Sequence, residues 1–466
     1  YGSRVDFEAL SSAGMMAAGT ANYIAPERIN GDRFDARADL YSLGCVLFEV
    51  VTGRVPFEAK RAAQVLVHHL STPPRSPSAL GSKIPAPLER LILQLLAKDP
   101  DQRPGHAQAI LHILQGLGVE PSQLSPAREP RPYLFKSKIL GRTPVIDGVR
   151  NKLNLAAAKG VGTLTLISGE SGVGKTTLAT EIVRQGRTWR MEIFAGQGSH
   201  LESSDPTTRQ EPLSAFLDIL RRVVDHCLAA EPELSDSIFG VRGALLAPIA
   251  PFIRDLPGQK RPVQIPPLPA DLARLRLLDA VVEVLDAYSM GSPMLIVLDD
   301  LQWADELSIH MLEHLTLNKL HERNWAVVGL YRSEEAPGTL RSLAQSASVE
   351  HIELARLSKD HTALMMAQML GMEDIPDALF EFILTQSEGN PFFVAEYLQL
   401  AVVQGVLHRN NAGDWTLSDT AHTDNLQGAG LPGSVQALID RRIQGVASDV
   451  WRWGEAAAVV GREVDP

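Results

Sequence analysis

Apolar residues in the first quarter of the chain recur at the spacing of amphipathic helices. This periodicity predicts four helices, over residues 38–52, 59–70, 87–96 and 105–117. Four prolines then break the pattern and predict an extended linker over residues 119–138; they are Pro121, Pro126, Pro130 and Pro132. We therefore expect a mostly helical first domain over residues 1–118, followed by this linker.

The middle of the chain alternates short apolar runs with long helical segments. The apolar runs predict strands over residues 163–168, 191–195, 293–298, 325–331 and 349–354. This alternation is typical of a parallel sheet with helices on both faces. From residue 357 onward the pattern becomes wholly helical, with short turns at 389–391 and 431–433. The predicted fold class is multidomain α and α/β: an α/β domain (139–355), a helical domain (356–430) and the start of another (431–466).

Composition narrows the range of partners. Hydrophobic residues make up 45% of the 466 residues and charged residues 21%, which is ordinary for a globular protein. The 44 basic and 55 acidic side chains give a net charge of −11, which argues against nucleic acid as the main partner because phosphate backbones demand a basic face. No apolar run approaches the roughly 20 residues that cross a bilayer. The chain starts at Tyr1 in a loop pattern and stops at Pro466 in a helical one, so we expect a fragment.

The two cysteines, Cys45 and Cys227, lie far apart in the sequence. Each is surrounded by apolar neighbours, which predicts buried free thiols rather than a disulfide. Free thiols are typical of a reducing compartment, so we expect a cytoplasmic protein.

A glycine-rich segment, G-E-S-G-V-G-K-T at residues 169–176, matches the phosphate-binding loop pattern G-x-x-x-x-G-K-[ST]. An apolar strand precedes it and a helix follows it, as this loop requires. Backbone N–H groups would then surround the β-phosphate of ATP, Lys175 would reach the β- and γ-phosphates, and Thr176 would hold Mg²⁺. The alternative is a glycine-rich turn that matches by chance. The expected ATP-binding residues are Gly169, Ser171, Gly172, Val173, Gly174, Lys175, Thr176 and Thr177.

The apolar run L-I-V-L at residues 295–298 ends in two carboxylates, Asp299 and Asp300. A buried strand that ends in this way is where a phosphate-loop enzyme presents its metal ligand. Asp299 is expected to bind Mg²⁺ through water, and Asp300 to polarise the attacking water. The alternative is an Asp-Asp turn that caps a core strand.

The run D-D-L-Q-W-A-D at residues 299–305 resembles the extended second ATP-binding motif of AAA-like, signal-transducing ATPases (the STAND class). L-G-R at 140–142, G-N-P-F-F at 389–393 and L-P-G at 431–433 resemble further motifs of this class, in the same order. The resemblance implies an ATPase domain, a helical lid and the start of a winged-helix domain. The segment 143–146 departs from it, because this class usually carries an acidic residue there.

The same resemblance assigns roles to three further residues. Arg332, after the fourth strand, would be the sensor arginine that reads the γ-phosphate; a solvated arginine at a strand end is an equal alternative. Pro391 would pack on adenine, although it could simply be a turn proline between helices. For Trp303 we favour an ordinary packing role.

Three motifs in the first domain resemble the C-lobe of Ser/Thr protein kinases: G-T-A-N-Y-I-A-P-E at 19–27, D-L-Y-S-L-G at 39–44 and K-D-P-D-Q-R-P at 98–104. The resemblance implies that Glu27 and Arg103 form a buried ion pair. Asp39 would accept backbone N–H groups of the catalytic loop, and Thr20 would contact the catalytic Asp and Lys. The loop serines Ser11 and Ser12 lie where activating phosphorylation often occurs, but an ordinary flexible loop is the favoured interpretation.

The kinase chemistry itself is missing from the sequence. The glycine-rich loop, the ATP-binding lysine and the catalytic loop are not found in this chain. V-D-F-E at 5–8 resembles the Asp-Phe-Gly motif, in which Asp6 would bind Mg²⁺, although glutamate replaces the glycine. We expect that this polypeptide alone does not phosphorylate proteins.

These observations favour a bacterial-type signalling Ser/Thr protein kinase with a fused ATPase switch that uses ATP and Mg²⁺. Protein substrates would be its partners, with self-association through the ATPase domain possible and sensor domains expected beyond Pro466. A non-enzymatic alternative is an ATP-operated scaffold with an inert kinase lobe. A catalytic Asp in the loop before Tyr1 would favour the kinase over the scaffold. A rapidly cycling ATPase motor is the third interpretation.

Overall fold

The computed structural model describes most of the chain, in two compact units. The described residues are 21–30, 34–59, 61–104, 107–118, 133–198, 212–230, 232–259, 266, 268–317, 320–372, 374–409, 415–418 and 431–438. The first unit contains Gly141–Arg356, and the second contains the described residues of Asp6–Leu140 and Leu357–Asp440. Among the described residues, no helix combines the length and apolar character needed to cross a membrane.

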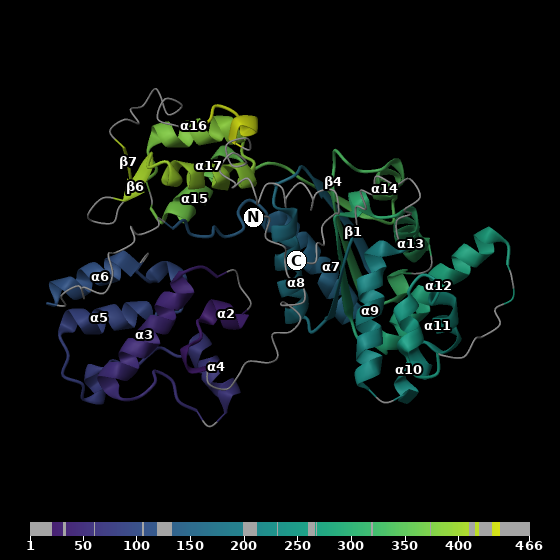
Figure 1. The fold of residues 1–466 in the computed structure, drawn as a ribbon, viewed down its shortest axis with the longest axis horizontal. Coiled ribbons are helices and arrows are strands. Elements are labelled where there is room, and N and C mark those ends of the chain that lie inside the picture. The colour runs from purple at the N-terminus through teal and green to yellow at the C-terminus, as the bar shows by residue number, and fades with distance from the viewer. Residues whose placement is uncertain are drawn as a thin grey trace, which may run out of the picture. The chain divides into compact units, whose positions relative to one another are not determined.

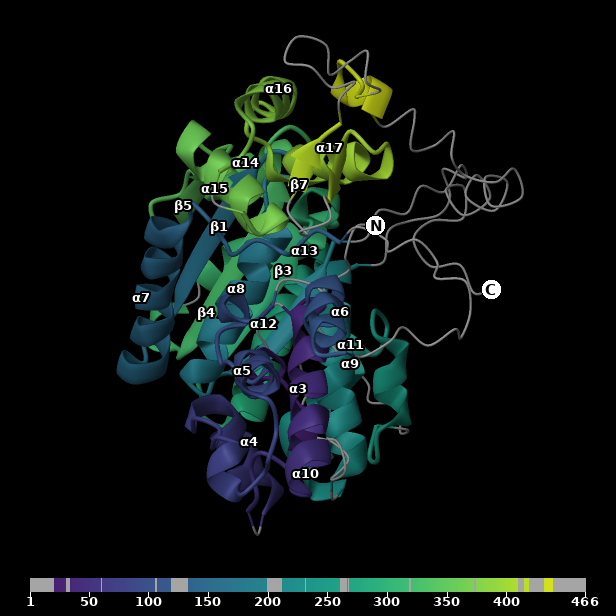
Figure 2. The ribbon, with the colours of Figure 1, turned by 90° about the vertical axis from the view of Figure 1, so that its left-hand side faces the viewer.

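The first unit is built on a parallel sheet (Figures 1 and 2). The sheet has five strands, in the order β2-β3-β4-β1-β5. Its strands are β1 (Thr163–Gly169), β2 (Glu192–Gln197), β3 (Met294–Asp299), β4 (Trp325–Arg332) and β5 (Glu350–Leu354). Every residue of β3 is buried, as expected for a central strand covered on both faces. The five predicted strands are therefore confirmed, each to within two residues at either end.

Helices cover both faces of this sheet (Figure 1). α7 (Thr143–Lys159) and α8 (Lys175–Thr188) contact each other on one face. The connections after β2 return across the sheet in the opposite direction, so right-handed crossovers place their helices on the other face. These helices are α9 (Ser214–Ala229), α10 (Pro232–Ile238), α11 (Gly240–Leu246), α12 (Ala270–Ser289), α13 (Glu306–Leu317) and α14 (Gly338–Ala344). The α/β architecture predicted from the alternating pattern is confirmed.

The N-terminal part of the second unit is a helical lobe. Its helices are α2 (Pro26–Asn30), α3 (Arg37–Thr52), α4 (Ala62–Ser71), α5 (Ala86–Leu95) and α6 (Ala107–Gly116), which confirms the four predicted helices. Tyr41, Cys45 and Phe48 of α3 pack against α5 in the core. A Cβ on Gly44 would lie 2.7 Å from the Cβ of Leu95, so the crossing of the two helices requires glycine here. Cys45 and Cys227 are both buried free thiols, as predicted, and burial raises the pKa of the Cys45 thiol to about 12.

The C-terminal part of the second unit contains three helices and a small hairpin. The helices are α15 (Lys359–Leu370), α16 (Asp377–Ser387) and α17 (Pro391–Val403). β6 (Leu407–Arg409) and β7 (Trp415–Leu417) pair antiparallel, so the prediction of a wholly helical pattern after residue 357 is wrong here. Three-residue strands are too short to show an alternating pattern. The hairpin is fixed by tertiary contacts instead, because Trp415 is buried and its indole N–H donates to the Leu370 carbonyl at 2.8 Å.

The end of the predicted linker is packed against both parts of the second unit. Phe135 is buried, its backbone N–H donates to the Met369 carbonyl (2.8 Å), and the Arg37 guanidinium lies 4.5 Å from its ring centroid. Lys138 pairs with Asp101 at 2.6 Å. Residues 133–138 therefore hold the lobe and the α15 region together by side-chain and backbone contacts.

Stability of the second unit should decrease as the pH falls, because of His69. This side chain is buried beside Phe57, and its Nδ1 lies 2.8 Å from the Tyr41 hydroxyl. Burial, aided by the Lys98 charge, lowers the pKa of His69 from 6.5 to about 4. Between these values the unfolded chain binds a proton that the folded chain does not, so the free energy of unfolding falls as pH drops, by at most about 1.4 kcal/mol per pH unit.

Urea unfolding between pH 7 and pH 4 tests this expectation. A His69→Gln variant should show a shallower loss of stability over that range than the wild type. The exposed His408 serves as a matched control, since His408→Asn should keep the wild-type slope. Equal slopes for His69→Gln and the wild type would contradict the assignment.

Candidate functional site

The glycine-rich loop joins the end of β1 to the start of α8 in the first unit. Gly172 and Gly174 adopt φ values of 79° and 101°, a left-handed conformation that side chains with a Cβ rarely adopt. Gly169 is required for a different reason, because a Cβ there would lie 3.0 Å from the Leu354 carbonyl oxygen. Val173 is buried below the loop. The loop leads directly into the N-terminus of α8, where the helix dipole favours an anion.

Lys175, the first residue of α8, is 8% exposed. Its ammonium donates to the carbonyl oxygens of Gly169 (2.7 Å) and Glu170 (2.8 Å), within its own loop. Burial lowers the pKa of Lys175, and the nearby carboxylate of Glu334 partly offsets this effect. A cation is thus held at the centre of the loop.

Asp299 ends β3 close to this cation and is also 8% exposed. Its carboxylate accepts from the Thr176 hydroxyl at 3.3 Å and from the Asp300 N–H at 2.8 Å. Burial raises the pKa of Asp299, the Asp300 charge raises it further, and the Lys175 charge lowers it. A hydroxyl and a carboxylate side by side are oxygen ligands of the kind that Mg²⁺ takes beside substrate phosphates, so these two residues fit the ion.

Asp300 follows the strand in a left-handed conformation, with φ at 51°. Two glutamine amides donate to its carboxylate: Gln197 to Oδ2 at 2.8 Å and Gln302 to Oδ1 at 2.9 Å. Gln197 ends β2, in register with Asp299. The sequence does not identify Gln197, because nothing in its neighbourhood indicates that it meets a residue 103 positions away.

Arg332 ends β4, and its guanidinium lies 4.7 Å from the Trp303 ring centroid. It also pairs with Glu335 at 2.7 Å. Trp303 therefore packs under a cation, which agrees with the packing role favoured from the sequence. Reading of the γ-phosphate by Arg332 remains a prediction.

The loop after β4 contributes a residue that the sequence analysis missed. The carboxylate of Glu334 accepts from the backbone N–H of Ser171 at 3.0 Å. That N–H belongs to the loop expected to hold phosphate. Glu334 and a phosphate oxygen would therefore compete for the same donor.

Arg142 and Asp305 hold the surroundings of the site in place. The buried Arg142 donates to the carbonyls of Val173 (3.2 Å) and Ala355 (2.6 Å), which fastens the back of the glycine-rich loop. Asp305 accepts from Leu213 N–H and Ser308 N–H, at 3.0 Å and 3.1 Å, and so links the start of α9 to that of α13. The last acid of the D-D-L-Q-W-A-D run is thus a structural anchor.

Several residues that were predicted to have functional roles lie in the second unit or outside the described residues. Pro391 is the first residue of α17 in the second unit, where the Asn390 side chain caps the helix by accepting from Phe392 N–H at 3.1 Å. A role on adenine remains a prediction for Pro391. Asp6, Ser11, Ser12 and Thr20 lie outside the described residues, as does most of the segment 431–466.

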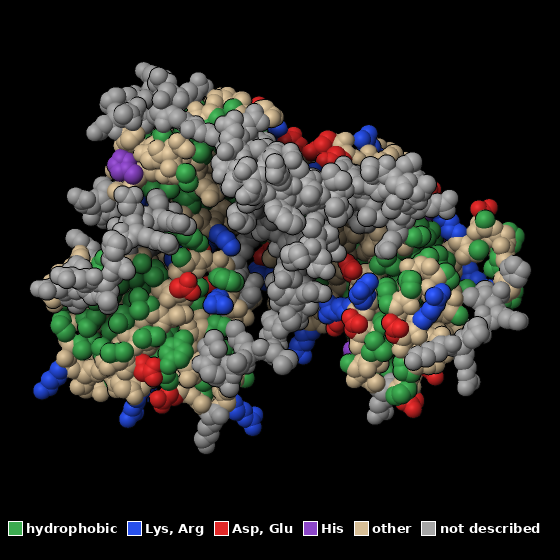
Figure 3. Space-filling view, in the orientation of Figure 1, with side chains coloured by type: hydrophobic (Ala, Val, Ile, Leu, Met, Phe, Trp, Pro, Cys, Tyr) green, Lys and Arg blue, Asp and Glu red, His purple; other side chains and the backbone are tan. Residues whose placement is uncertain are grey.

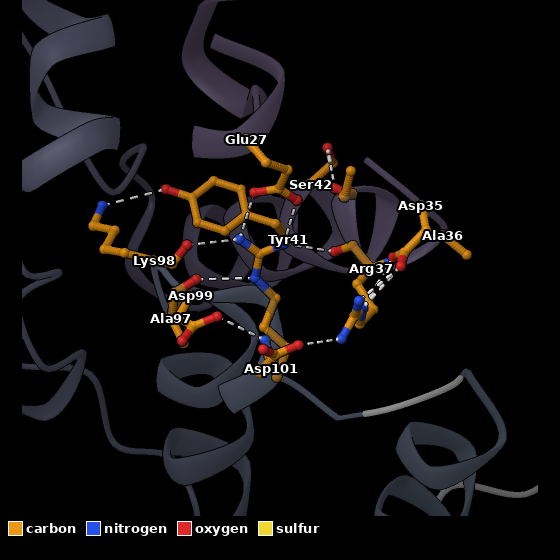
Figure 4. A network of polar contacts seen from close by, with 12 residues as sticks. Glu27, Asp35, Ala36, Arg37, Tyr41, Ser42, Ala97, Lys98, Asp99 and Asp101 are labelled. Atoms are coloured by element: carbon orange, nitrogen blue, oxygen red, sulfur yellow. Dashed lines mark hydrogen bonds and ion pairs between the residues drawn. The ribbon is translucent and has the colours of Figure 1, made fainter. Parts of the chain in front are cut away.

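Glu27 and Arg103 form a buried bidentate ion pair in the helical lobe, with N–O distances of 2.7 and 2.8 Å. Their exposed fractions are 6% and 5%. Figure 4 shows Glu27, Tyr41 and the backbone of Ala97 and Lys98 converging from separate elements. The guanidinium donates to the Ala97 carbonyl at 2.9 Å and lies 4.8 Å from the Tyr41 ring centroid. Every side of the charge is therefore in contact with an acceptor or a ring face.

Asp39 lies in the first turn of α3 and is exposed. Three apolar side chains continue the same face of the helix at helical spacing, namely Leu43, Val46 and Val50, with 37%, 44% and 74% exposure. Figure 3 shows apolar side chains gathered over the lobe that contains this helix. The expected contact of Asp39 with a catalytic loop remains a prediction.

Comparisons with known proteins match three successive segments of the chain. A model of the protein kinase domain matches residues 5–114, a model of the AAA ATPase domain matches residues 138–328, and a domain of unknown function (DUF8739) matches residues 358–411. The chain therefore carries part of a protein kinase domain fused to an AAA ATPase domain, two domains that imply the use of ATP.

Relatives are found among kinases of bacteria and of Dictyostelium. Serine/threonine-protein kinase PknB of Mycobacterium tuberculosis is 46% identical over 85 residues, which is 18% of this chain and 14% of that protein. Serine/threonine-protein kinase pkn3 of Myxococcus xanthus is 36% identical over 141 residues, 30% of this chain and 25% of that protein. Hybrid signal transduction histidine kinase G of Dictyostelium discoideum is 24% identical over 348 residues, 66% of this chain and 10% of that protein. The chain thus spans a quarter or less of each of these relatives.

One solved structure, a variant of RuvB from Thermotoga maritima, has 15% sequence identity and a TM-score of 0.30. The match covers 57% of this chain and 63% of that chain.

Replacing Arg103 by Met should destabilise the second unit by roughly 3–5 kcal/mol, because it leaves the Glu27 charge buried without its partner. Urea unfolding of the single variants and of the Glu27→Leu/Arg103→Met double variant measures the pair. The double variant should lose less stability than the two single losses added together. Arg28→Met, which removes an exposed arginine from the same segment, is the control and should have little effect. A loss for Arg103→Met no larger than the control would contradict the role of the pair.

Proposed function

We propose that this chain belongs to a signalling Ser/Thr protein kinase whose fused ATPase, of the signal-transducing STAND type, is an ATP-operated switch. The chain itself binds ATP with Mg²⁺ and hydrolyses it slowly, whereas phosphoryl transfer to protein Ser or Thr takes place in the longer protein. One observation carries the proposal: Lys175, Thr176 and Asp299 meet at the same edge of one parallel sheet.

The binding step follows from the charges of the site. The N–H groups of residues 171–176 and the Lys175 ammonium hold the β- and γ-phosphates. Thr176 and Asp299 hold Mg²⁺, which neutralises charge on the phosphate oxygens when bound. Glu334 leaves the Ser171 N–H as phosphate arrives.

The hydrolytic step depends on Asp300. Its carboxylate orients a water molecule for attack on the γ-phosphorus and accepts a hydrogen bond from that water. Arg332 senses the γ-phosphate from the end of β4. Slow turnover suits a switch, in which the bound nucleotide rather than the rate of its turnover carries the signal.

The helical lobe supplies the kinase part of the proposal. The Glu27–Arg103 pair fastens residues 23–27 to the lobe, and this segment would form the floor for the substrate residue. In the longer protein, Thr20 would contact the catalytic Asp and Lys, and Asp39 would accept backbone N–H groups of the catalytic loop. Protein substrates in the cytoplasm are the proposed partners, with self-association through the ATPase domain. The match to the protein kinase domain over residues 5–114 and the similarity to bacterial Ser/Thr kinases support this assignment.

Replacing Lys175 by Ala should abolish ATP·Mg²⁺ binding, because the loop loses the cation that meets the β- and γ-phosphates. Calorimetric titration of the 466-residue chain with ATP·Mg²⁺ measures this. Lys159→Ala, at the exposed end of α7, is the matched control and should bind as the wild type does. An unchanged titration for Lys175→Ala would refute the assignment of the phosphate-binding loop.

Replacing Asp300 by Asn should leave ATP binding intact and lower hydrolysis by about 100-fold or more, because an amide cannot accept the proton of the attacking water. Phosphate release measured together with the Kd for ATP separates the two effects. Asp225→Asn, an exposed acid of α9, should change neither. If binding and turnover both survive in Asp300→Asn, this carboxylate is only structural.

A further inference from the structure

Gln302 lies in a short 3₁₀ helix (Leu301–Trp303) directly after β3, and it is 7% exposed. Both ends of its side-chain amide are bonded. Its Nε2 donates to Asp300 Oδ1 at 2.9 Å, and its Oε1 accepts from the backbone N–H of Arg332 at 3.0 Å. The two contacts fix the orientation of the amide independently, because a carboxylate must face the NH₂ group and an N–H must face the oxygen.

The Asp300 carboxylate needs such support. The residue follows the end of the strand with a φ of 51°, a conformation that few non-glycine residues adopt. Its orientation therefore depends on the groups that bond its two oxygens. Gln197 bonds one oxygen from β2, and Gln302 bonds the other.

The side-chain oxygen of Gln302 contacts the end of β4, the strand that carries Arg332, the predicted sensor arginine. Arg332 is the last residue of β4, and its guanidinium lies over Trp303, the residue that follows Gln302. The Gln302 oxygen accepts a hydrogen bond from the Arg332 N–H at the point where β4 ends. One buried amide thus spans the distance between the Asp300 carboxylate and the backbone of Arg332.

We propose that Gln302 is a positioning residue for ATP hydrolysis: it holds the Asp300 carboxylate and ties its orientation to the end of β4. This inference rests on the proposed ATPase function of the site. Gln302 makes its contacts with Asp300 and with the end of β4, so the hydrolytic rate depends on it more than nucleotide affinity does.

Two variants whose side chains are similar in length to glutamine distinguish the contact with Asp300 from the contact with the Arg332 N–H. Gln302→Glu keeps an oxygen for the Arg332 N–H but removes the donor to Asp300, and Gln302→Met removes both. Both variants should lower kcat by about tenfold or more, with the Kd for ATP within about threefold of wild type. Amide hydrogen exchange at Arg332 should speed up in Gln302→Met and stay slow in Gln302→Glu.

Gln345→Met, an exposed glutamine of the same unit, is the matched control, and urea unfolding shows whether each variant is folded. Wild-type kcat in Gln302→Glu would overturn the inference, and so would a loss of ATP affinity that matches the loss of rate in both variants. A wild-type chain that binds no ATP would instead refute the proposed function. The exchange measurement needs no nucleotide. Unchanged exchange at Arg332 in Gln302→Met would therefore overturn the proposed link between Gln302 and the end of β4 even if the chain binds no ATP.

Discussion

The first unit depends on two opposite charges that are buried at one edge of its sheet. Removing an ammonium and a carboxylate from water is costly, and each charge is retained only because fixed groups surround it. Lys175 is held by carbonyls of its own loop, and Asp299 by a hydroxyl and a backbone N–H. The pKa of Lys175 is lowered and that of Asp299 raised by the same burial, so each charge is easier to lose there than in water. A bound phosphate would pair with the Lys175 ammonium, and a divalent cation would pair with the Asp299 carboxylate.

The strand order explains how the two charges come together. β4 lies between β1, which leads to Lys175, and β3, which ends in Asp299. The groups must therefore meet across the end of a third strand. Gly329 of β4 makes room for this, because a Cβ there would lie 2.5 Å from the Leu301 side chain. Leu301 consequently packs on the strand and carries the 3₁₀ helix with Gln302 and Trp303 toward Arg332.

The sequence predicted those features that depend on residues close together along the chain. Runs of apolar residues locate the buried strands, and the G-x-x-x-x-G-K-[ST] spacing specifies a loop whose conformation only glycines at 172 and 174 allow. The contacts of Gln197 and Glu334 join residues 103 and 163 positions apart, and no local pattern encodes such pairs. The β6–β7 hairpin was missed for a related reason, because its strands are fixed by the Trp415–Leu370 contact rather than by their own periodicity.

The residues around Arg332 connect the Ser171 N–H to the Asp300 carboxylate. Glu334 bonds the Ser171 N–H, and Arg332, two residues earlier, pairs with Glu335 and stacks on Trp303. A phosphate that takes the Ser171 N–H must displace Glu334, and its negative charge repels that carboxylate while it attracts the arginine. Both effects act on the same short loop at the end of β4. Because the N–H of Arg332 is bonded to Gln302, a shift of this loop reaches Asp300 through a single amide. Under the proposed function, detection of phosphate and orientation of the attacking water would depend on one continuous set of contacts, which would suit a switch whose turnover waits for the correct nucleotide.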